Sequence, residues 1–436
     1  MIKNNPKITN AWCMYDWANS AYSLVITSAI FPVYFGAVAI EKEGSNYITF
    51  LGFHLKNSVL FSGAVSFSFL LISILNPFLS SIADYSGKKK NFMQFFCYLG
   101  SISCALLFFF ENSSYTTFAV FAFIFAGIGY SGSIVFYNSY LPEIATEDRF
   151  DKLSAKGFSL GYLGSVILLV FNLSMILKPS LYGIGEFAVK NGLPARISFL
   201  SVGIWWALFA QITFSRLPNN IYQRQPSGNY LLNGYHELQK VLKELKYQNG
   251  LKMFLISFFF YNMGVQTVMY LAAIFGDKEL KLESSNLIMV VLILQLVAIF
   301  GAWAFSRISG KIGNIKTLII MVFIWIGICI GAYFVTTGNE FYLLASVVGL
   351  VMGGVQALSR ATYAKFLPSD TTDTASYFSF YDITDKIGTV IGTAVFAVID
   401  QFTNMRNSIL ALMIFFIIGI IFLMVLNNKK LKMGMR

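Results

Sequence analysis

Long apolar segments constrain the fold of this chain more than any single motif does. Twelve segments are each long enough to cross a bilayer, which takes about 20 residues of helix. The composition agrees, because 56% of the residues are hydrophobic and 12% are charged, whereas a soluble domain has about 25% charged residues. The sequence therefore predicts an all-α integral membrane protein with twelve transmembrane helices, at 12–39, 57–82, 92–111, 115–140, 157–178, 196–215, 252–276, 285–306, 316–337, 341–361, 375–399 and 407–427.

The basic residues predict which side of the membrane each end of the chain occupies. Lys3 and Lys7 precede the first apolar segment, and no small-residue cleavage site follows it, so we expect an uncleaved first helix. Of the 32 Lys and Arg residues, 23 lie in segments on the side of the N-terminus, 8 lie on the other side and Lys386 lies within the membrane. The positive-inside rule then predicts cytoplasmic termini and a place in the cytoplasmic (inner) membrane. This asymmetry and anionic lipid headgroups explain the net charge of +11 without a nucleic-acid partner.

A weak internal repeat relates the two ends of the chain. Ser86-Gly87-Lys88 recurs as Ser309-Gly310-Lys311, and Leu141-Pro142 recurs as Leu367-Pro368, at offsets close to half the chain length. Parallel repeats of this kind are a known transporter plan, with the binding site near the bilayer midplane between the halves. The repeat therefore predicts an N-terminal six-helix bundle at residues 1–215, a cytoplasmic linker at 216–250 and a C-terminal six-helix bundle at 251–436.

The linker contains the longest polar stretch of the chain, from Arg216 to Gln248. Leu238, Leu242 and Leu245 recur there at helical spacing beside several lysines, which is typical of an amphipathic helix at a membrane surface. Two interpretations stay open for it: a plain helix that joins the halves, and a regulatory or partner-binding segment.

One apolar segment, at 375–399, carries charges near its centre. Asp382 and Lys386 are four residues apart and share a helical face. Lys386 lies about 15 Å along the helix from Ser376, near the middle of a hydrocarbon core about 30 Å thick. An unpaired charge at that depth costs several kcal/mol, so both side chains should face protein or a water-filled cavity. They either take part in transport directly or form a structural ion pair that fixes the packing of two helices.

The loop after the second segment carries an acid, a glycine and a basic cluster, namely Asp84, Gly87 and Lys88 to Lys90. Gly87 permits a tight turn, and the lysines would anchor the loop at the inner headgroups. This pattern resembles the signature loop of the major facilitator superfamily. The resemblance implies that Asp84 contacts the N-terminal end of the eleventh helix, where the helix dipole favours negative charge, and latches the halves together in one access state. A loop that only sets topology would explain the lysines but not Asp84. In the second copy Arg307 aligns with the acid, so no equivalent latch is expected there.

Three further stretches narrow the resemblance: Trp12 to Tyr22, Tyr137-Asn-Ser-Tyr-Leu-Pro-Glu and Gly353-Gly-Val-Gln-Ala-Leu-Ser-Arg. Together with the segment around Lys386, and across both halves, they resemble the major facilitator branch that includes the fungal vacuolar amino-acid effluxers tied to autophagy and many bacterial relatives. The resemblance implies secondary transport by alternating access, without chemistry on the substrate; amino-acid efflux is known for the fungal members only. The family usually has a small residue before the lysine of the eleventh helix. Asp385 stands there in this chain and changes the electrostatics of that site.

Polar residues within the apolar segments are candidates for the solute and ion pathway. Asp16 would couple transport to a proton gradient if it takes up a proton; alternatively it caps its helix or meets interfacial water. Asn262 and Gln266 share one helical face, as do Gln356 and Arg360, and such groups suit a zwitterion or another small polar solute. Alternatively they form hydrogen bonds between helices, each worth about 1 kcal/mol. The predicted pathway residues are Asp16, Asn19, Tyr22, Tyr137, Asn138, Asn262, Gln266, Gln356, Asp382, Asp385 and Lys386, and the predicted gating or latch residues are Asp84, Gly87 and Arg360.

Other classes of function lack their signatures in this sequence. The four cysteines fit neither a metal motif nor a disulfide framework, and no GxxxxGK[ST] phosphate-binding loop is present. We therefore expect no enzyme, no metal and no cofactor. The expected partners are a small-molecule solute, membrane lipids and, under the coupling hypothesis, protons, with the protein as a monomer. The alternatives are transport of a sugar, nucleoside, peptide or drug, and a receptor or sensor that kept a transporter fold without moving a solute.

Overall fold

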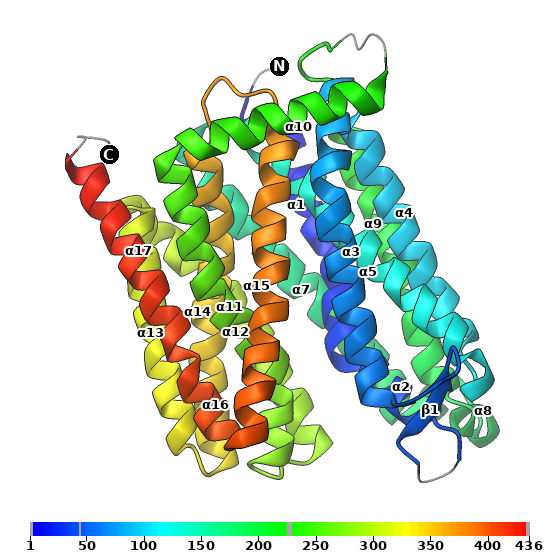
Figure 1. Ribbon diagram of the computed structural model, residues 1–436. Coiled ribbons are helices and arrows are strands. Elements are labelled where there is room, and N and C mark those ends of the chain that lie inside the picture. The colour runs from blue at the N-terminus through cyan, green and yellow to red at the C-terminus, as the bar shows by residue number, and fades with distance from the viewer. Residues whose placement is uncertain (1–2, 43–44, 225–228, 433–436) are drawn as a thin grey trace.

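The computed structural model describes residues 3–42, 45–224 and 229–432, and it is built almost entirely of helices (Figure 1). The first half contains α1 (Pro6–Ala21), η1 (Tyr22–Ala29), α2 (Phe31–Val38), β1 (Tyr47–Phe50), β2 (Phe53–Lys56), α3 (Asn57–Ser86), α4 (Lys89–Leu106), η2 (Leu107–Phe109), η3 (Ser113–Tyr115), α5 (Thr116–Ser139), α6 (Leu141–Ile144), η4 (Glu147–Arg149), α7 (Phe150–Leu177), η5 (Pro179–Tyr182), α8 (Glu186–Lys190) and α9 (Leu193–Arg216). After α10 (Tyr230–Tyr247), the second half contains α11 (Asn249–Lys278), α12 (Ser284–Ile312), α13 (Asn314–Phe334), α14 (Gly338–Phe366), α15 (Thr374–Phe402), α16 (Met405–Ala411) and α17 (Met413–Lys432).

The first span is bent, although its sequence reads as one continuous apolar helix. α1 starts at Pro6, and the Asn5 side chain caps it by accepting from the backbone N–H of Lys7. The chain then widens into the eight-residue π-helix η1. The angle between the combined helix Pro6–Ala29 and α2 is 41°. Pro32 lies in the first turn of α2 and has no backbone N–H to continue the hydrogen-bond ladder, which accounts for a bend at this point.

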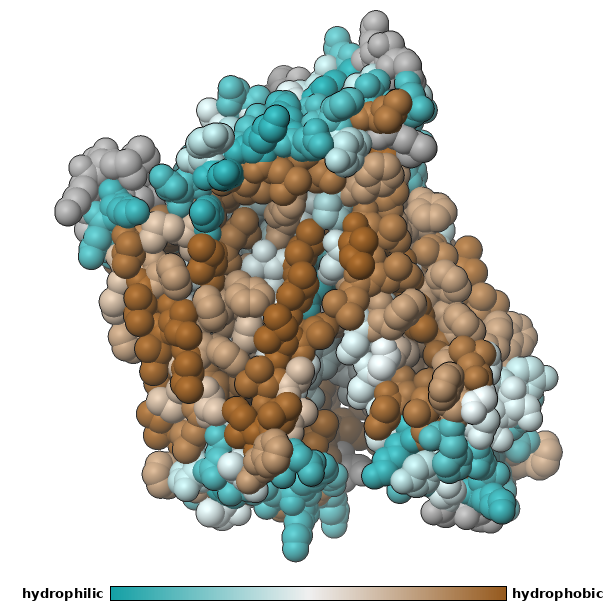
Figure 2. All heavy atoms as spheres, in the orientation of Figure 1, coloured by the Kyte–Doolittle hydropathy of each residue, from teal (hydrophilic) through white to brown (hydrophobic). Residues whose placement is uncertain are grey.

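Ten helices of the described residues are long and apolar enough to cross a membrane, and the bent first pair brings the number to eleven. The remaining span, α15, is 29 residues long but carries Asp382, Asp385 and Lys386, which set its composition apart. On the face shown in Figure 2, a broad apolar band lies between two hydrophilic ends. The all-α membrane fold of twelve spans predicted from the sequence is therefore confirmed.

The halves pack against each other mainly through four helix pairs: α3 and α5 pack against α15, and α7 packs against α12 and α14. Both termini and α10 lie at one end of the bundle (Figure 1). We call this the closed end, because the contacts between the halves described below gather there. At the opposite end, which we call the open end, a cleft separates the halves (Figure 2).

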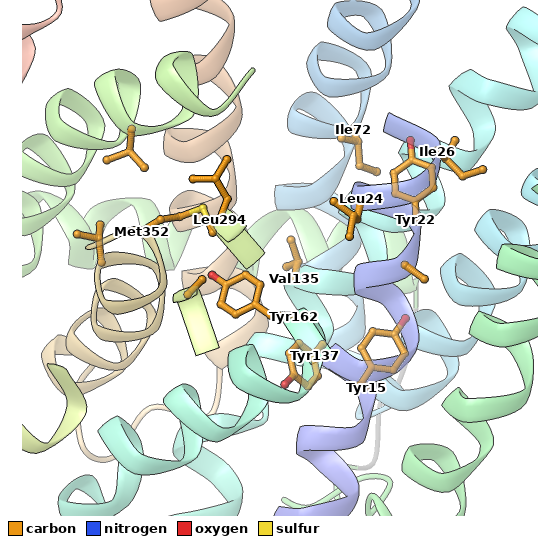
Figure 3. Close-up of a cluster of buried hydrophobic side chains, with 14 of the residues drawn as sticks. Tyr15, Tyr22, Leu24, Ile26, Ile72, Val135, Tyr137, Tyr162, Leu294 and Met352 are labelled. Atoms are coloured by element: carbon orange, nitrogen blue, oxygen red, sulfur yellow. The ribbon is translucent and has the colours of Figure 1, made fainter. Parts of the chain in front are cut away.

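The interior of the first half is rich in aromatic side chains (Figure 3). Tyr15 and Tyr22 come from α1 and η1, and Tyr137 comes from α5; all three are almost fully buried. Tyr162 of α7 lies between them and the second half, where Leu294 is buried (Figure 3). The labelled side chains thus include tyrosines of the first half and, in the second half, the buried Leu294 and Met352 (Figure 3).

The hairpin of β1 and β2 was not predicted. Tyr47 pairs with Lys56 and Phe50 pairs with Phe53 in antiparallel register. Leu51 and Gly52 both have positive φ, which is typical of a two-residue hairpin turn whose twist matches the strands. The hairpin lies at the open end (Figure 1).

Candidate functional site

The α15 cluster consists of Asp382, Asp385 and Lys386. Lys386 Nζ lies 2.8 Å from Asp385 Oδ2 and 4.0 Å from Asp382 Oδ1. Helical spacing alone suggests that Lys386 pairs with Asp382, one turn earlier. The nearer carboxylate is instead that of the adjacent residue, Asp385. The exposed fractions of the side chains are 5% for Asp382, 11% for Lys386 and 16% for Asp385. The ammonium therefore lies between two carboxylates inside the protein.

Two amides of α11 hold Asp385 from within the second half. Asn262 Nδ2 donates to Asp385 Oδ1 over 2.7 Å, and Gln266 Nε2 donates to the same oxygen over 3.0 Å. With the ammonium of Lys386, the Asp385 carboxylate receives three donors. Charge-assisted hydrogen bonds of this kind are stronger than neutral ones, so Asp385 and its partners form a well-ordered group.

The first half supplies the partners of Asp382 and one contact of Lys386. Asn76 Nδ2, on α3, donates to Asp382 Oδ2 over 2.9 Å, and Lys386 Nζ lies 5.0 Å from the centre of the Phe69 ring. Asn76 is fully buried, and its Oδ1 has no hydrogen-bond partner. Each half therefore holds one carboxylate of the α15 cluster.

Arg360 of α14 is the centre of a second buried network, nearer the closed end. Its Nη1 and Nη2 each lie 3.1 Å from Asp16 Oδ2, and Nη1 donates to Asn138 Oδ1 over 3.2 Å. Arg360 also donates to the hydroxyl and the backbone carbonyl of Ser154 over 2.9 Å each. The Tyr137 hydroxyl donates to Asp16 Oδ2 over 2.7 Å. This Arg360 network links the second half to three spans of the first.

Aromatic rings and a glycine shape the space around the Arg360 guanidinium. Its carbon lies 4.2 Å from the Phe158 ring centre, 4.9 Å from that of Trp12 and 5.4 Å from that of Tyr137. A Cβ at Gly157 would overlap Asp16 Oδ2, so only glycine permits this approach of α7. Asp16 thus neither caps its helix nor lies free in the pathway; it is the counter-ion of Arg360.

The remaining predicted pathway residues lie on other contacts. Gln356 Oε1 accepts from the Tyr162 hydroxyl over 2.5 Å, again across the halves. Asn19 is buried in α1, and its Nδ2 has no partner. The ring of Tyr22 lies 4.9 Å from that of Tyr130 and 6.0 Å from that of Trp206, so Tyr22 packs within the first half.

Asp84, at the end of α3, contacts the first turn of α15. Its Oδ2 accepts from the backbone N–H and the hydroxyl of Ser376 over 2.7 and 2.8 Å, and its Oδ1 lies 3.3 Å from the backbone nitrogen of Ala375. A carboxylate at a helix N-terminus meets unpaired N–H groups and the positive end of the dipole. Gly87 ends α3 in the left-handed region, at φ +68°, which turns the chain into the following basic loop.

Lys89 reinforces the contact of Asp84 with α15. Its Nζ lies 3.4 Å from Asp84 Oδ1 and 2.6 Å from Glu143 Oε1. The same ammonium donates to the Thr374 hydroxyl over 2.6 Å, and Thr374 donates to Glu143 over 2.8 Å. Of the three lysines of the loop motif, Lys89 is thus buried between the halves, whereas the sequence predicted that it would anchor the loop at the inner headgroups.

The second copy of the loop motif also joins the halves, but here the acid, Asp151, comes from the first half. Asp151, in the first turn of α7, accepts from the Ser309 hydroxyl over 2.9 Å and from Asn314 Nδ2 over 2.8 Å. Lys365 Nζ lies 2.9 Å from the same carboxylate. Arg307, which aligns with Asp84, instead stacks 3.9 Å from the Trp303 ring centre. The loop lacks the acid as expected, but the neighbouring half provides one.

α10 lies across the closed end over α3 and α15 (Figure 1). Lys240 Nζ lies 2.7 Å from Asp373 Oδ2, just before α15, and Arg224 lies 3.0 Å from Asp373 Oδ1. Burial alone would raise the pKa of Asp373, but hydrogen bonds from Glu237 and Lys240 and the charges of Lys240 and Arg224 hold that pKa below its usual value. Burial and the neighbouring Asp373 raise the pKa of Glu237.

Several residues of these networks were missed from sequence. Asn76 interrupts an apolar segment and could have been found by the criterion that singled out Asp382. Asp151, Ser154 and Glu143 lie at helix starts, where polar residues are common, so only the fold shows that they meet partners more than 150 residues away in the chain.

Solved structures with this architecture identify the fold. The major facilitator transporter FucP in its outward conformation matches with a TM-score of 0.73, covering 97% of this chain and 99% of that one at 13% identity. The human organic anion transporter MFSD10 matches with a TM-score of 0.71, covering 97% and 100% at 13% identity. At these identities the likeness shows the fold alone, which is that of the major facilitator superfamily.

Sequence relatives then define the family. The family described as "Vacuole effluxer Atg22 like" matches residues 4–434, and the chain belongs to this family. The uncharacterized MFS-type transporter YxiO of Bacillus subtilis is 31% identical over 426 residues, which cover 97% of this chain and 95% of YxiO. Autophagy-related protein 22 of Kluyveromyces lactis is 25% identical over 393 residues, covering 83% and 77%. The resemblance seen in the motifs is confirmed, and the protein is a transporter and not an enzyme.

Proposed function

We propose that this transporter moves a small polar solute, with amino acids as the first class to test, by secondary active transport. The observation that carries the proposal is the division of the α15 cluster between the halves. Asn76 of the first half holds Asp382, whereas Asn262 and Gln266 of the second half hold Asp385. A solute that interacts with this cluster therefore acts on groups whose partners separate when the halves move apart.

The contacts at the closed end support alternating access as the mechanism. Asp84 with Ser376, Asp16 with Arg360 and Asp151 with Lys365 all pair one half with the other. In the proposed cycle these contacts break when the closed end opens, while the cleft at the open end closes around the solute. The α15 cluster lies between the two ends and is reached from each in turn.

The orientation and the remaining assignments follow the loop charges. We place both termini and α10 in the cytoplasm, because the side that they share carries most of the Lys and Arg. The conformation described here is then open to the outside. We further propose that residues 1–215 and 251–436 move as two bodies joined by 216–250, that the protein acts as a monomer in the cytoplasmic membrane, and that a proton gradient provides the driving force.

Uptake into proteoliposomes tests this proposal. Purified protein is reconstituted and supplied with radiolabelled amino acids, with and without an imposed pH gradient. We expect saturable uptake that the gradient accelerates. Lys386→Ala should abolish uptake, because it removes the only cation of the α15 cluster. Lys316→Ala, which changes an exposed lysine at the start of α13, should leave uptake unchanged and serves as the matched control.

Two outcomes would contradict the proposal. Wild type and Lys386→Ala could be equally inert with amino acids, sugars, nucleosides, peptides and drug-like compounds alike. Alternatively, wild type could bind a solute, seen as a raised melting temperature, without moving it into vesicles; that result would indicate a receptor or sensor.

A further inference from the structure

The α15 cluster has an excess of negative charge. It contains two carboxylates and one ammonium, so its net charge is −1 when both acids are ionised. The helices that face it add no compensating charge: α3 has no charged residue before Asp84, α5 has none, and the charged residues of α11 lie near its ends. Asp16 and Arg360, the buried ion pair nearer the closed end, neutralise each other.

The two carboxylates are not equally supplied with donors. Asp385 receives hydrogen bonds from Asn262, Gln266 and Lys386, all within 3.0 Å. Asp382 receives one hydrogen bond, from Asn76, and its distance to Lys386 Nζ is 4.0 Å. The excess of acceptors therefore lies at Asp382.

The environment of Asp382 offers a second, independent sign of a missing donor. Asn76 is fully buried and already donates to Asp382, but its own Oδ1 acceptor has no partner. One turn away on α3, Ser73 is also buried, and its hydroxyl has no partner. Buried polar atoms are nearly always satisfied, so this place suits a ligand that brings N–H donors and a positive charge.

Asp385 also changes what Lys386 can bind. A free ammonium in a cleft would attract the carboxylate of an anionic or zwitterionic solute. Here the Asp385 carboxylate is already paired with that ammonium at 2.8 Å, and two amides donate to the same carboxylate. A solute carboxylate would have to displace a well-ordered ion pair, which costs affinity.

From these observations we infer that the cleft selects solutes of net positive charge, whose ammonium or guanidinium group binds at Asp382 and Asn76, and that Asp385 sets this selectivity by occupying Lys386. The inference rests on the proposed function only in that the solute enters this cleft. It assigns Asp385 as a specificity-determining residue.

Binding of amino acids that are similar in shape but differ in charge tests the selectivity directly. Arginine and citrulline have nearly the same shape but differ by one positive charge, and lysine and glutamine form a second pair. With the purified full-length protein, calorimetry and thermal unfolding should show that arginine binds at least about 30-fold more tightly than citrulline, equivalent to about 2 kcal/mol. Lysine should likewise exceed glutamine, and glutamate should bind least.

Two variants of equal charge separate the role of Asp385 from a general charge effect. Asp382→Asn and Asp385→Asn both bring the cluster to net zero. Asp382→Asn should lose arginine binding without gaining citrulline binding, because Lys386 stays paired with Asp385. Asp385→Asn should release Lys386, so citrulline binding should rise and the preference for arginine should fall at least about tenfold. Asp385→Glu should retain the preference, and Asp400→Asn, at the far end of α15, is the control.

The inference is overturned if citrulline binds wild type as tightly as arginine, as it would if a proton neutralised the cluster. It is also overturned if no cationic probe binds, or if both Asn variants change the preference equally. If Asp385→Asn fails to fold, the wild-type pairs and Asp382→Asn still decide the charge preference. Transport of a neutral amino acid without arginine binding would leave the proposed function standing, whereas arginine binding without flux would leave the selectivity standing and overturn transport.

Discussion

Replacing Asp16 by asparagine removes one charge from the Arg360 network with little change in shape. Asp16 Oδ2 lies 3.1 Å from both terminal nitrogens of Arg360. After the change the guanidinium keeps its hydrogen bonds to Ser154 and Asn138 but has no counter-ion. Because Asp16 and Arg360 belong to different halves, the loss acts on the conformation in which the halves meet at the closed end.

The size of the effect follows from burial. Arg360 is 2% exposed and Asp16 is 6% exposed, and removing one partner of a buried ion pair costs about 3–5 kcal/mol. The aromatic rings around the guanidinium recover part of this cost through cation–π attraction, so the lower value, about 3 kcal/mol, applies. When the closed end opens, water solvates Arg360 and the penalty disappears. The ratio of open to closed conformers at this end should therefore rise about 150-fold.

Distances between spin labels measure this ratio. Ser215 on α9 and Lys311 on α12 are exposed and belong to different halves near the closed end. They can be changed to cysteine and labelled, after replacement of the four native cysteines, which are all buried. Asp16→Asn should shift the distance distribution toward longer values. Adding Arg360→Gln should reverse much of that shift, because it removes the unpaired charge.

The reasoning fails if Asp16→Asn leaves the distance distribution of wild type unchanged. It fails equally if the effects of the two substitutions simply add in the double variant, because residues that form one ion pair must show a coupling energy.

Two further predictions concern stability. Gly353→Ala should destabilise the protein by about 1–3 kcal/mol in thermal unfolding, because a Cβ at Gly353 would overlap the Ala298 carbonyl of α12. Gly327→Ala is the control, because a Cβ at Gly327 meets nothing within 4 Å. Equal effects of the two substitutions would contradict this packing. Glu237→Gln should raise the melting temperature near pH 7 by a small amount. The folded protein raises the pKa of Glu237 above 4.5, so the stability contributed by its protonated form is present below pH 4.5 and lost as the pH rises through the folded pKa. The neutral amide should retain that stability, and its advantage should vanish in acid; an advantage that persists at pH 4 would contradict this account.

The spans could be predicted because the hydrocarbon core imposes a minimum helix length, and the chain meets it in every segment. α15 is the informative case. Asp382 and Lys386 place charges near its centre, and these charges marked it as the segment most in need of a partner. Helical spacing could not predict which carboxylate pairs with Lys386, because the contact with Asp385 depends on side-chain orientation and not on helical periodicity.

The networks between the halves could be predicted only in part. Asp84 was singled out because its motif is local. The contact of Asp151 with Ser309 joins residues 158 positions apart, and no local pattern links them. Asp16 and Arg360 were both chosen as polar residues in apolar segments, but their pairing depends on how α1 and α14 pack at one end. The hairpin at Tyr47 to Lys56 was missed because its strands are short and lie in a loop that the membrane does not constrain.

Helices α3 and α15 run alongside each other and make contact at two levels, Asn76 with Asp382 and, eight residues further along α3, Asp84 with Ser376. Eight residues of helix span about 12 Å; both helices are continuous over this length, with Pro77 inside that part of α3. A displacement of one helix relative to the other therefore disturbs both levels together. A ligand that separates Asp382 from Asn76 therefore also weakens the contact of the Asp84 carboxylate with the first turn of α15. By thermodynamic linkage, loss of the Asp84 contact changes the affinity for that ligand by the same free energy.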